Sequence, residues 1–169
     1  MLGICIEMKV LNIHSRKVNS PKHKLLELLD TLSTKEDKIW PIEKWPAMNF
    51  KKGLTIGAYG GHGPIRYELI EYSPQSHLTF KFKKPKGFKG IHKLEFIESN
   101  PEQTEIKHTI DMTTSGVGTL KWLTAIKWLH NALIEDAFDK IENQLSGKSI
   151  RTKWNSWVKI LRAVLLPQK

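Results

Sequence analysis

Residues 60–74 read GGHGPIRYELIEYSP, and three further segments with alternating apolar and polar side chains follow them as far as Met112. In His77–Lys83, a leucine and two phenylalanines alternate with threonine and lysine. Such alternation is typical of a strand with one buried and one solvated face. A pattern with helical spacing then runs from about Val117 to Leu145. This order predicts antiparallel strands closed by one long helix, with a pocket between them.

The rest of the chain is divided by turn and cap signals. The predicted elements are a strand at 9–18, a helix entered at Ser20-Pro21, a short helix capped by Ser33 or Thr34, a loop over 40–46, a turn at 60–63, and strands at 51–59, 65–72, 77–83, 88–98 and 104–112. The long helix is expected to end at Ser146-Gly147. Its solvated face is predicted to carry Glu135, Asp136, Asp139, Lys140 and Glu142.

The length of 169 residues suits one domain with a substantial core. No apolar run reaches the roughly 18 residues that span a bilayer. The apolar start lacks the basic residues of a signal peptide, and Met8 is an alternative start to Met1. Cys5 is the only cysteine, so an internal disulfide is impossible. A reducing, cytoplasmic location is therefore expected.

The net charge of +10 is concentrated near the C-terminus. Six basic residues and no acidic residue lie between Lys148 and Lys169. We expect a domain at 1–147 and a basic amphipathic helix at 148–169 that ends at Pro167. Its apolar face is expected to pack on the body or on a partner subunit, and the alternative is a peripheral contact with an anionic membrane. The contact residues would be Trp154, Trp157, Lys153, Lys159 and Arg162.

The order of a strand, two short helices, consecutive antiparallel strands and a long helix, over Met8 to Leu145, resembles the START/Bet v 1-like superfamily, also called SRPBCC. Residues 61–67, 87–88 and 128–133 are similar to an uncharacterised bacterial branch labelled polyketide cyclase-like. The resemblance implies an α+β helix-grip fold, in which a curved antiparallel β-sheet wraps around a long C-terminal α-helix. Family members bind lipids, sterols or aromatic polyketides, and some are cyclases. No catalytic motif carries over.

His92 and His108 share the buried face of consecutive strands. If Ser99-Asn100-Pro101 is the hairpin loop, Glu98 pairs with Glu102, and the two imidazoles lie opposite each other about 4.5–5.5 Å apart. Such a pair can contact the polar group of a ligand, act in acid–base chemistry, or satisfy itself by mutual hydrogen bonding. A register slip of two would separate the rings.

The expected function is binding of a small hydrophobic ligand, either a lipid or a polycyclic or aromatic molecule, in an internal cavity. The alternatives are a cyclase-like enzyme that uses the cavity histidines and a membrane-peripheral lipid carrier. No cofactor, metal or nucleic-acid partner is expected, because no spacing supports a site at His62, His92 and His108 and no nucleic-acid motif occurs. The predicted ligand-binding residues are His92, His108, Phe80, Phe82, Leu94, Phe96, Ile106, Ile110, Met112, Ile126, His130 and Trp45, with Leu123 and Leu133 in the same wall.

Further residues are expected at the edge of the pocket or on the surface of the sheet. Trp40, Trp45 and the glycine-rich turn are expected at the mouth of the pocket. Arg66 and Glu68 either form a surface ion pair or line the pocket, according to which face of their strand is buried, and the surface pair is favoured.

Overall fold

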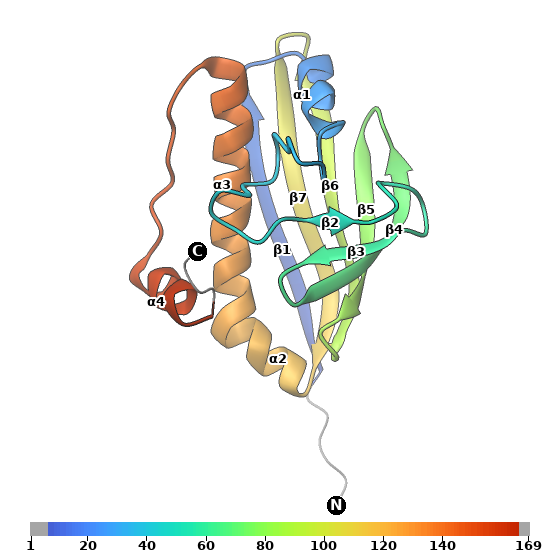
Figure 1. Ribbon diagram of the computed structural model, residues 1–169, viewed down its shortest axis with the longest axis vertical. Helices are drawn as coiled ribbons and strands as arrows, with labels where there is room; N and C mark the ends of the chain where they lie inside the picture. The colour runs from blue at the N-terminus through green and yellow to red at the C-terminus, as the bar shows by residue number, and fades with distance from the viewer. Residues whose placement is uncertain (1–6, 166–169) are drawn as a thin grey trace, which may run out of the picture.

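The computed structural model describes residues 7–165, so the predictions about Cys5, Met1 and Pro167 lie outside the described residues. Seven strands form one antiparallel sheet that curves around helix α3 (Figure 1). Across the sheet the order is β1-β7-β6-β5-β4-β3-β2. The strands are β1 (Glu7–Val18), β2 (Asn49–Phe50), β3 (Tyr59–His62), β4 (Ile65–Ser73), β5 (His77–Lys84), β6 (Phe88–Asn100) and β7 (Gln103–Ser115).

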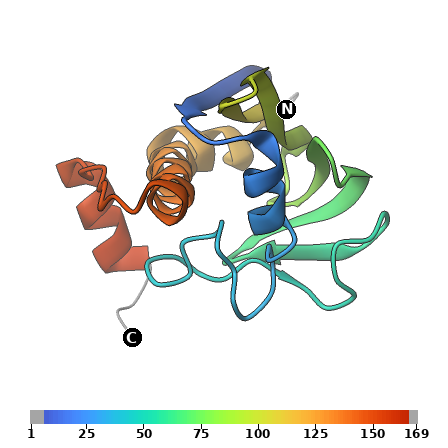
Figure 2. The same cartoon turned by 90° about the horizontal axis from the view of Figure 1, so that it is seen from above.

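The helices complete an α+β helix-grip arrangement, as predicted. They are α1 (Lys22–Leu29), α2 (Val117–Lys121), the π-helical turn η1 (Trp122–Ile126), α3 (Lys127–Ser146) and α4 (Ser156–Leu165). Figure 2 shows α3 end-on, with the sheet on one side and α4 on the other. Gly147 ends α3 in the left-handed conformation, as expected. Within residues 7–165, no helix has the length and apolar character needed to cross a membrane.

The β6–β7 register differs from the predicted one by two residues. β6 continues to Asn100, which pairs with Gln103, and a bulge follows Glu98. His92 therefore pairs with Ile110, and Leu94 pairs with His108. The prediction of directly opposed histidines is wrong. The slip is even, however, so both side chains stay on the same face of the sheet.

The glycine-rich region is also arranged differently. The predicted strand over 51–59 is absent from the described fold, where residues 51–58 form turns. Gly53 and Gly57 have φ values of 70° and 84°, and this left-handed conformation interrupts a strand. Gly60 and Gly61 lie inside β3, and a Cβ atom on either would collide with the neighbouring strands. The turn between β3 and β4 is at Gly63-Pro64.

The predicted short helix capped by Ser33 or Thr34 is wrong, whereas the helix predicted to be entered at Ser20-Pro21 begins at Lys22. Residues 33–37 form turns, because the Asp37 carboxylate accepts hydrogen bonds from the backbone N–H groups of Ser33, Ile39 and Trp40. Pro21 occupies the N-cap position of α1, without a capping hydrogen bond from Ser20.

β4 buries Ile65, Tyr67 and Leu69, so Arg66 and Glu68 lie on its outer face. The predicted ion pair between them is replaced by other contacts. Glu68 pairs with Lys83 at 2.6 Å. Arg66 donates to the carbonyl oxygens of Gly63 and Ile65.

The start of the long helix is shifted in phase. Its π-helical turn η1 adds a residue to one helical turn, so the side chains around it rotate relative to a regular α-helix. Trp122 is 3% exposed, whereas Leu123 is 48% exposed. The prediction that Leu123 lines the pocket is therefore wrong, and Trp122 fills that place.

Candidate ligand-binding pocket

A cavity of about 110 Å³ lies between the concave face of the sheet and α3. The exposed residues Gly63 and Pro64, and the half-buried Ile126 and Leu129, mark where it approaches the surface. The lining consists of Trp40, Trp45, Pro46, His62, Gly63, Pro64, Ile65, Tyr67, Phe82, Phe88, His92, His108, Ile110, Trp122, Ile126, Leu129, His130, Leu133 and Ile134.

A second cavity of about 30 Å³ adjoins the first. Trp40, Ile134, His92 and His108 line both cavities, so these four side chains form the partition between them. Both walls are otherwise apolar or aromatic apart from the histidines and Tyr67. A rearrangement of Trp40 or of the two imidazoles would join the two spaces.

A row of rings crosses the larger cavity. The centroid of Tyr67 lies 4.6 Å from that of His92, His92 lies 5.6 Å from His108, and His108 lies 5.0 Å from His130. His62 continues the row beyond Tyr67, at 6.0 Å. The rings come from β3, β4, β6, β7 and α3, so the complete row depends on the tertiary fold.

Several polar atoms of this row are buried without a hydrogen-bond partner among residues 7–165. They are Tyr67 Oη, His92 Nε2, His108 Nδ1, and both Nδ1 and Nε2 of His130, and we call them the unpaired pocket atoms. Leaving a buried polar group unpaired costs about 1–3 kcal/mol. Most buried polar side-chain atoms in proteins are paired, so this group requires an explanation.

Burial determines the protonation state of the pocket. It lowers the pKa of His62 to about 4, with a contribution from Arg66, and it lowers the pKa of His130 to about 3. Burial also holds the pKa values of His92 and His108 well below the usual range. The same cause raises the pKa of Tyr67. At neutral pH the pocket therefore has uncharged imidazoles and a protonated phenol.

The predicted ligand-binding residues fall into three groups. Trp45, Phe82, His92, His108, Ile110, Ile126 and His130 line the larger cavity, as does Leu133 from the same predicted wall. Phe80 and Leu94 line only the smaller cavity. Phe96, Ile106 and Met112 are buried in the packed core and line neither of these two cavities.

Sequence reasoning missed Tyr67 and Trp122 as pocket residues. The face of β4 was undecided, since both faces carry apolar residues, and the π-helical turn leaves no simple mark in the hydrophobic pattern. Trp40 and Gly63 do line the cavity, near the place expected for its mouth.

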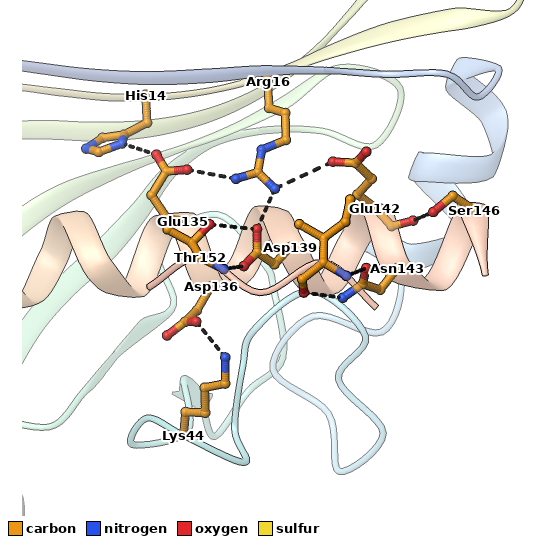
Figure 3. A network of polar contacts seen from close by, with 11 residues as sticks. His14, Arg16, Lys44, Glu135, Asp136, Asp139, Glu142, Asn143, Ser146 and Thr152 are labelled. Atoms are coloured by element: carbon orange, nitrogen blue, oxygen red, sulfur yellow. Dashed lines mark hydrogen bonds and ion pairs between the residues drawn. The ribbon is translucent and has the colours of Figure 1, made fainter. Parts of the chain in front are cut away.

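The acidic residues of α3 form a polar network on another face of the helix, buried at Asp136 and Asp139 and half-buried at Glu135 and Glu142 (Figure 3). Asp139 is 2% exposed and accepts a hydrogen bond from Arg16 of β1 at 2.7 Å. It also accepts from Thr152, which precedes α4. Glu135 accepts from Arg16 at 2.8 Å and contacts His14 at 2.7 Å. The prediction of a solvated acidic face is wrong, because these carboxylates join α3 to β1 and to the C-terminal segment.

Asp136 joins α3 to two segments, the 40–46 loop and the segment before α4. Its carboxylate accepts hydrogen bonds from Lys44 at 2.6 Å, from Trp45 Nε1 at 2.8 Å and from Trp154 Nε1 at 2.9 Å. The guanidinium of Arg162 lies 4.3 Å from the ring centroids of both tryptophans. Because Trp45 also lines the cavity, this cluster fixes one wall of the pocket.

The C-terminal segment packs on the body through α3, which was the favoured of its two predicted arrangements. Val158 and Leu161 of α4 are buried, and Trp157 Nε1 donates to the carbonyl oxygen of Thr124. Trp154 precedes the helix and points inward, as its bond to Asp136 shows. Lys153 and Lys159 are exposed.

The histidines in the row of rings do not surround a common point where a metal ion could be bound. Among the described side chains, no group of three or more His, Cys, Asp or Glu residues has the arrangement of a metal site.

Solved structures with this fold are numerous. A protein from Nitrosospira multiformis matches with a TM-score of 0.62 and 12% identity, over 84% of this chain and 100% of the other. Norcoclaurine synthase from Thalictrum flavum, in complex with dopamine and hydroxybenzaldehyde, matches with a TM-score of 0.62 and 10% identity, over 86% and 91%. A protein from Rhizobium leguminosarum matches with a TM-score of 0.57 and 12% identity, over 86% and 99%.

No protein-family model matches the chain, and no curated protein sequence matches it either. The similarity is therefore one of fold. The chain shares the helix-grip fold of these structures, among them norcoclaurine synthase, which binds dopamine and hydroxybenzaldehyde in its own structure.

Proposed function

We propose that the protein binds a small, uncharged, single-ring molecule with a hydroxyl group in the cavity between the sheet and α3. The observation that carries this proposal is the set of unpaired pocket atoms in an otherwise apolar cavity. Apolar walls supply affinity, and a few polar atoms fix the orientation of a ligand.

The volume of the cavity favours a ligand with one ring. A cavity of roughly 150 Å³ lined by apolar side chains holds one benzene molecule. The larger cavity here measures about 110 Å³ and the smaller about 30 Å³. A polycyclic compound or a lipid chain would need the partition at Trp40, and the surrounding wall, to move.

The chemistry of the unpaired pocket atoms favours a hydroxyl group. A neutral imidazole offers one donor and one acceptor, and a hydroxyl group offers both in return. A carboxylate or ammonium group would lose its hydration in this pocket without gaining an opposite charge, which is costly. Norcoclaurine synthase, which has a similar fold, is found with dopamine and hydroxybenzaldehyde, both of which carry one aromatic ring.

The pKa values weigh against the enzymatic alternative. A general base works best when its pKa lies near the operating pH. Burial holds the pKa values of the pocket histidines far below neutrality, so these imidazoles are weak bases. Binding without proton abstraction is the simpler role.

The experiment compares phenol with toluene, which has the same size and shape but lacks the hydroxyl group. Binding is followed by NMR chemical shifts of the indole N–H groups of Trp40, Trp45 and Trp122, which line the cavity. We expect phenol to bind with a dissociation constant on the order of 1 mM or tighter. Toluene should bind several-fold more weakly, and benzoate should not bind at pH 7.

Equal affinity for phenol and toluene would contradict the role of the unpaired pocket atoms. Failure of both compounds to shift the pocket indoles would contradict the binding site itself. Native mass spectrometry of gently purified protein, with organic extraction, would then identify any ligand that the protein carries from the cell.

A further inference from the structure

The apolar side chains of α4 span a wider arc of the helix than the part that packs on the body. Val158 and Leu161 face α3 and are buried. Ile160 and Val164 point away from that contact and are 53% and 73% exposed. Trp157 and Leu165 are also exposed by about half. A helix that only had to pack on α3 would carry polar residues at these outer positions.

A second exposed apolar strip lies next to this arc. Val117 and Leu120 of α2 and Leu123 of η1 are all exposed by about half or more. The hydrogen bond from Trp157 Nε1 to the carbonyl oxygen of Thr124, at 3.0 Å, brings α4 against η1. The α2–η1 strip and the outer arc of α4 therefore meet at Trp157, and we call the combined area the α2–α4 face. Exposed apolar areas of this kind mark interaction sites.

The charge of the α2–α4 face has one sign. It is formed by segments 112–134 and 143–165, which contain no aspartate or glutamate, although the whole chain has 17 acidic residues. Both segments carry basic residues, and Lys121, Lys153 and Lys159 are exposed beside the apolar side chains. All the acidic residues are thus excluded from the two segments that form the exposed apolar area.

We propose that the α2–α4 face is a docking surface for an anionic phospholipid membrane. Tryptophan and aliphatic side chains bordered by lysines are typical of helices that lie in the membrane interface. Basic residues beside them are attracted to the negative surface potential of anionic lipids. The Trp45–Arg162 contact links this face to the pocket wall, so a docked protein would hold its cavity next to the bilayer. The inference does not depend on the identity of the pocket ligand.

The test is co-sedimentation of the full chain with vesicles of phosphatidylcholine containing 30% phosphatidylserine. We expect binding at 50 mM salt and a large loss of binding at 500 mM salt, because salt screens the attraction. Vesicles of pure phosphatidylcholine should bind at least about tenfold more weakly, since several lysines contribute.

Substitutions separate the apolar and the charged contributions. The double variant Ile160→Asn/Val164→Asn should reduce binding to the anionic vesicles by about tenfold or more. Its matched control is Leu11→Asn/Ile13→Asn, which changes two comparably exposed aliphatic residues on β1 and should bind like the wild type. The charge variant Lys121→Glu/Lys159→Glu should also bind weakly. Its control, Lys35→Glu/Lys52→Glu, makes the same charge change at exposed positions elsewhere and should not.

Three results would overturn the proposal. The first is no sedimentation with anionic vesicles at 50 mM salt. The second is equal loss of binding in the surface variants and in their controls, which would indicate attraction by net charge alone. The third is a concentration-dependent dimer that dissociates in Ile160→Asn/Val164→Asn, which would assign the face to a second copy of the chain. Thermal melting of each variant should match that of the wild type, because all the changed side chains are exposed.

Discussion

On one face of α3, Asp136 and Asp139 have partners from β1, the 40–46 loop and the C-terminal segment. On the face toward the sheet, both nitrogens of His130 are buried without a partner in the described part of the chain. The two faces belong to one helix, and the two carboxylate residues and the ring nitrogens of His130 are all buried. The first joins segments of the fold, whereas the second leaves hydrogen-bonding capacity for a molecule from outside.

The difference indicates how a buried polar residue can be assigned a role. Satisfied polar groups such as Asp136 are expected to contribute stability and conformational order. Unsatisfied groups such as His130 cost stability, and their retention suggests a function. The two faces should therefore respond to substitution with opposite signs, and His14 beside the first face should respond to pH with the opposite sign to His130.

The largest expected effect is a loss of stability on acidification. Burial lowers the pKa of His62, His92, His108 and His130 in the folded protein, whereas an unfolded histidine titrates near 6.5. The unfolded chain therefore binds more protons below pH 6.5, and stability falls as the pH drops from 6.5 toward 4. Since each pKa unit corresponds to about 1.36 kcal/mol, the shifts of His62 and His130 alone predict a loss of several kcal/mol. Urea denaturation at pH 7.5, 6, 5 and 4.5 measures it.

The contribution of His14 to stability should depend on pH in the opposite direction. Burial acts to lower its pKa, but hydrogen bonds with Glu135 and Asn131 outweigh burial and raise it. Its contribution is fully present below pH 6.5 and is lost as the pH rises through its folded pKa.

The double variant His92→Leu/His108→Leu should lose less stability between pH 6.5 and 4 than the wild type. An unchanged slope would contradict the assignment of that loss to the pocket.

The next largest effect is a loss of stability on the face of α3 that carries Asp136 and Asp139. Asp136→Ala leaves two indole N–H groups and the Lys44 ammonium without their acceptor. Breaking a buried ion pair by removing one partner typically costs about 3–5 kcal/mol. Urea denaturation should show a loss of about 3 kcal/mol. The control is Glu43→Ala, which removes an exposed ion pair with Lys140 and should cost less than about 1 kcal/mol. Similar losses in the two variants would refute the distinction.

The smallest expected effect is a gain in stability instead of a loss. His108→Leu replaces a buried imidazole with an unpaired nitrogen by an apolar side chain of similar size. We expect the free energy of unfolding to rise by about 1 kcal/mol, because the cost of the unpaired atom is removed. Phenol affinity should fall at the same time. As a control, Ile110→Val changes a neighbouring pocket residue and should lose about 0.5–1.5 kcal/mol. A destabilised His108→Leu variant would show that the imidazole is satisfied.

The strand alternation was enough to predict the architecture, because period-2 patterns in 77–83, 88–98 and 104–112 specify which face is buried. It also placed His92 and His108 on that face, and an even register slip preserved this placement. The exact pairing depended on a bulge after Glu98, which has no reliable mark in the local sequence.

Other features depend on contacts between distant segments. Asp136 and Asp139 resemble surface residues in a helical pattern, and only the approach of Arg16, Trp45 and Trp154 makes their burial favourable. Trp122 became a pocket residue through the π-helical turn, and Tyr67 did so once the phase of β4 was settled. These residues could not be found from periodicity alone.

The central claim is that neutral, unpaired imidazoles in the pocket receive the hydroxyl group of a ligand. Long-range ¹H–¹⁵N NMR of the histidine side chains at pH 7, with and without phenol, tests it directly. The account predicts uncharged rings for His92, His108 and His130, and ring-nitrogen shifts that move with phenol but not with toluene. Protonated rings at pH 7, or ring nitrogens that do not respond to saturating phenol, would contradict it.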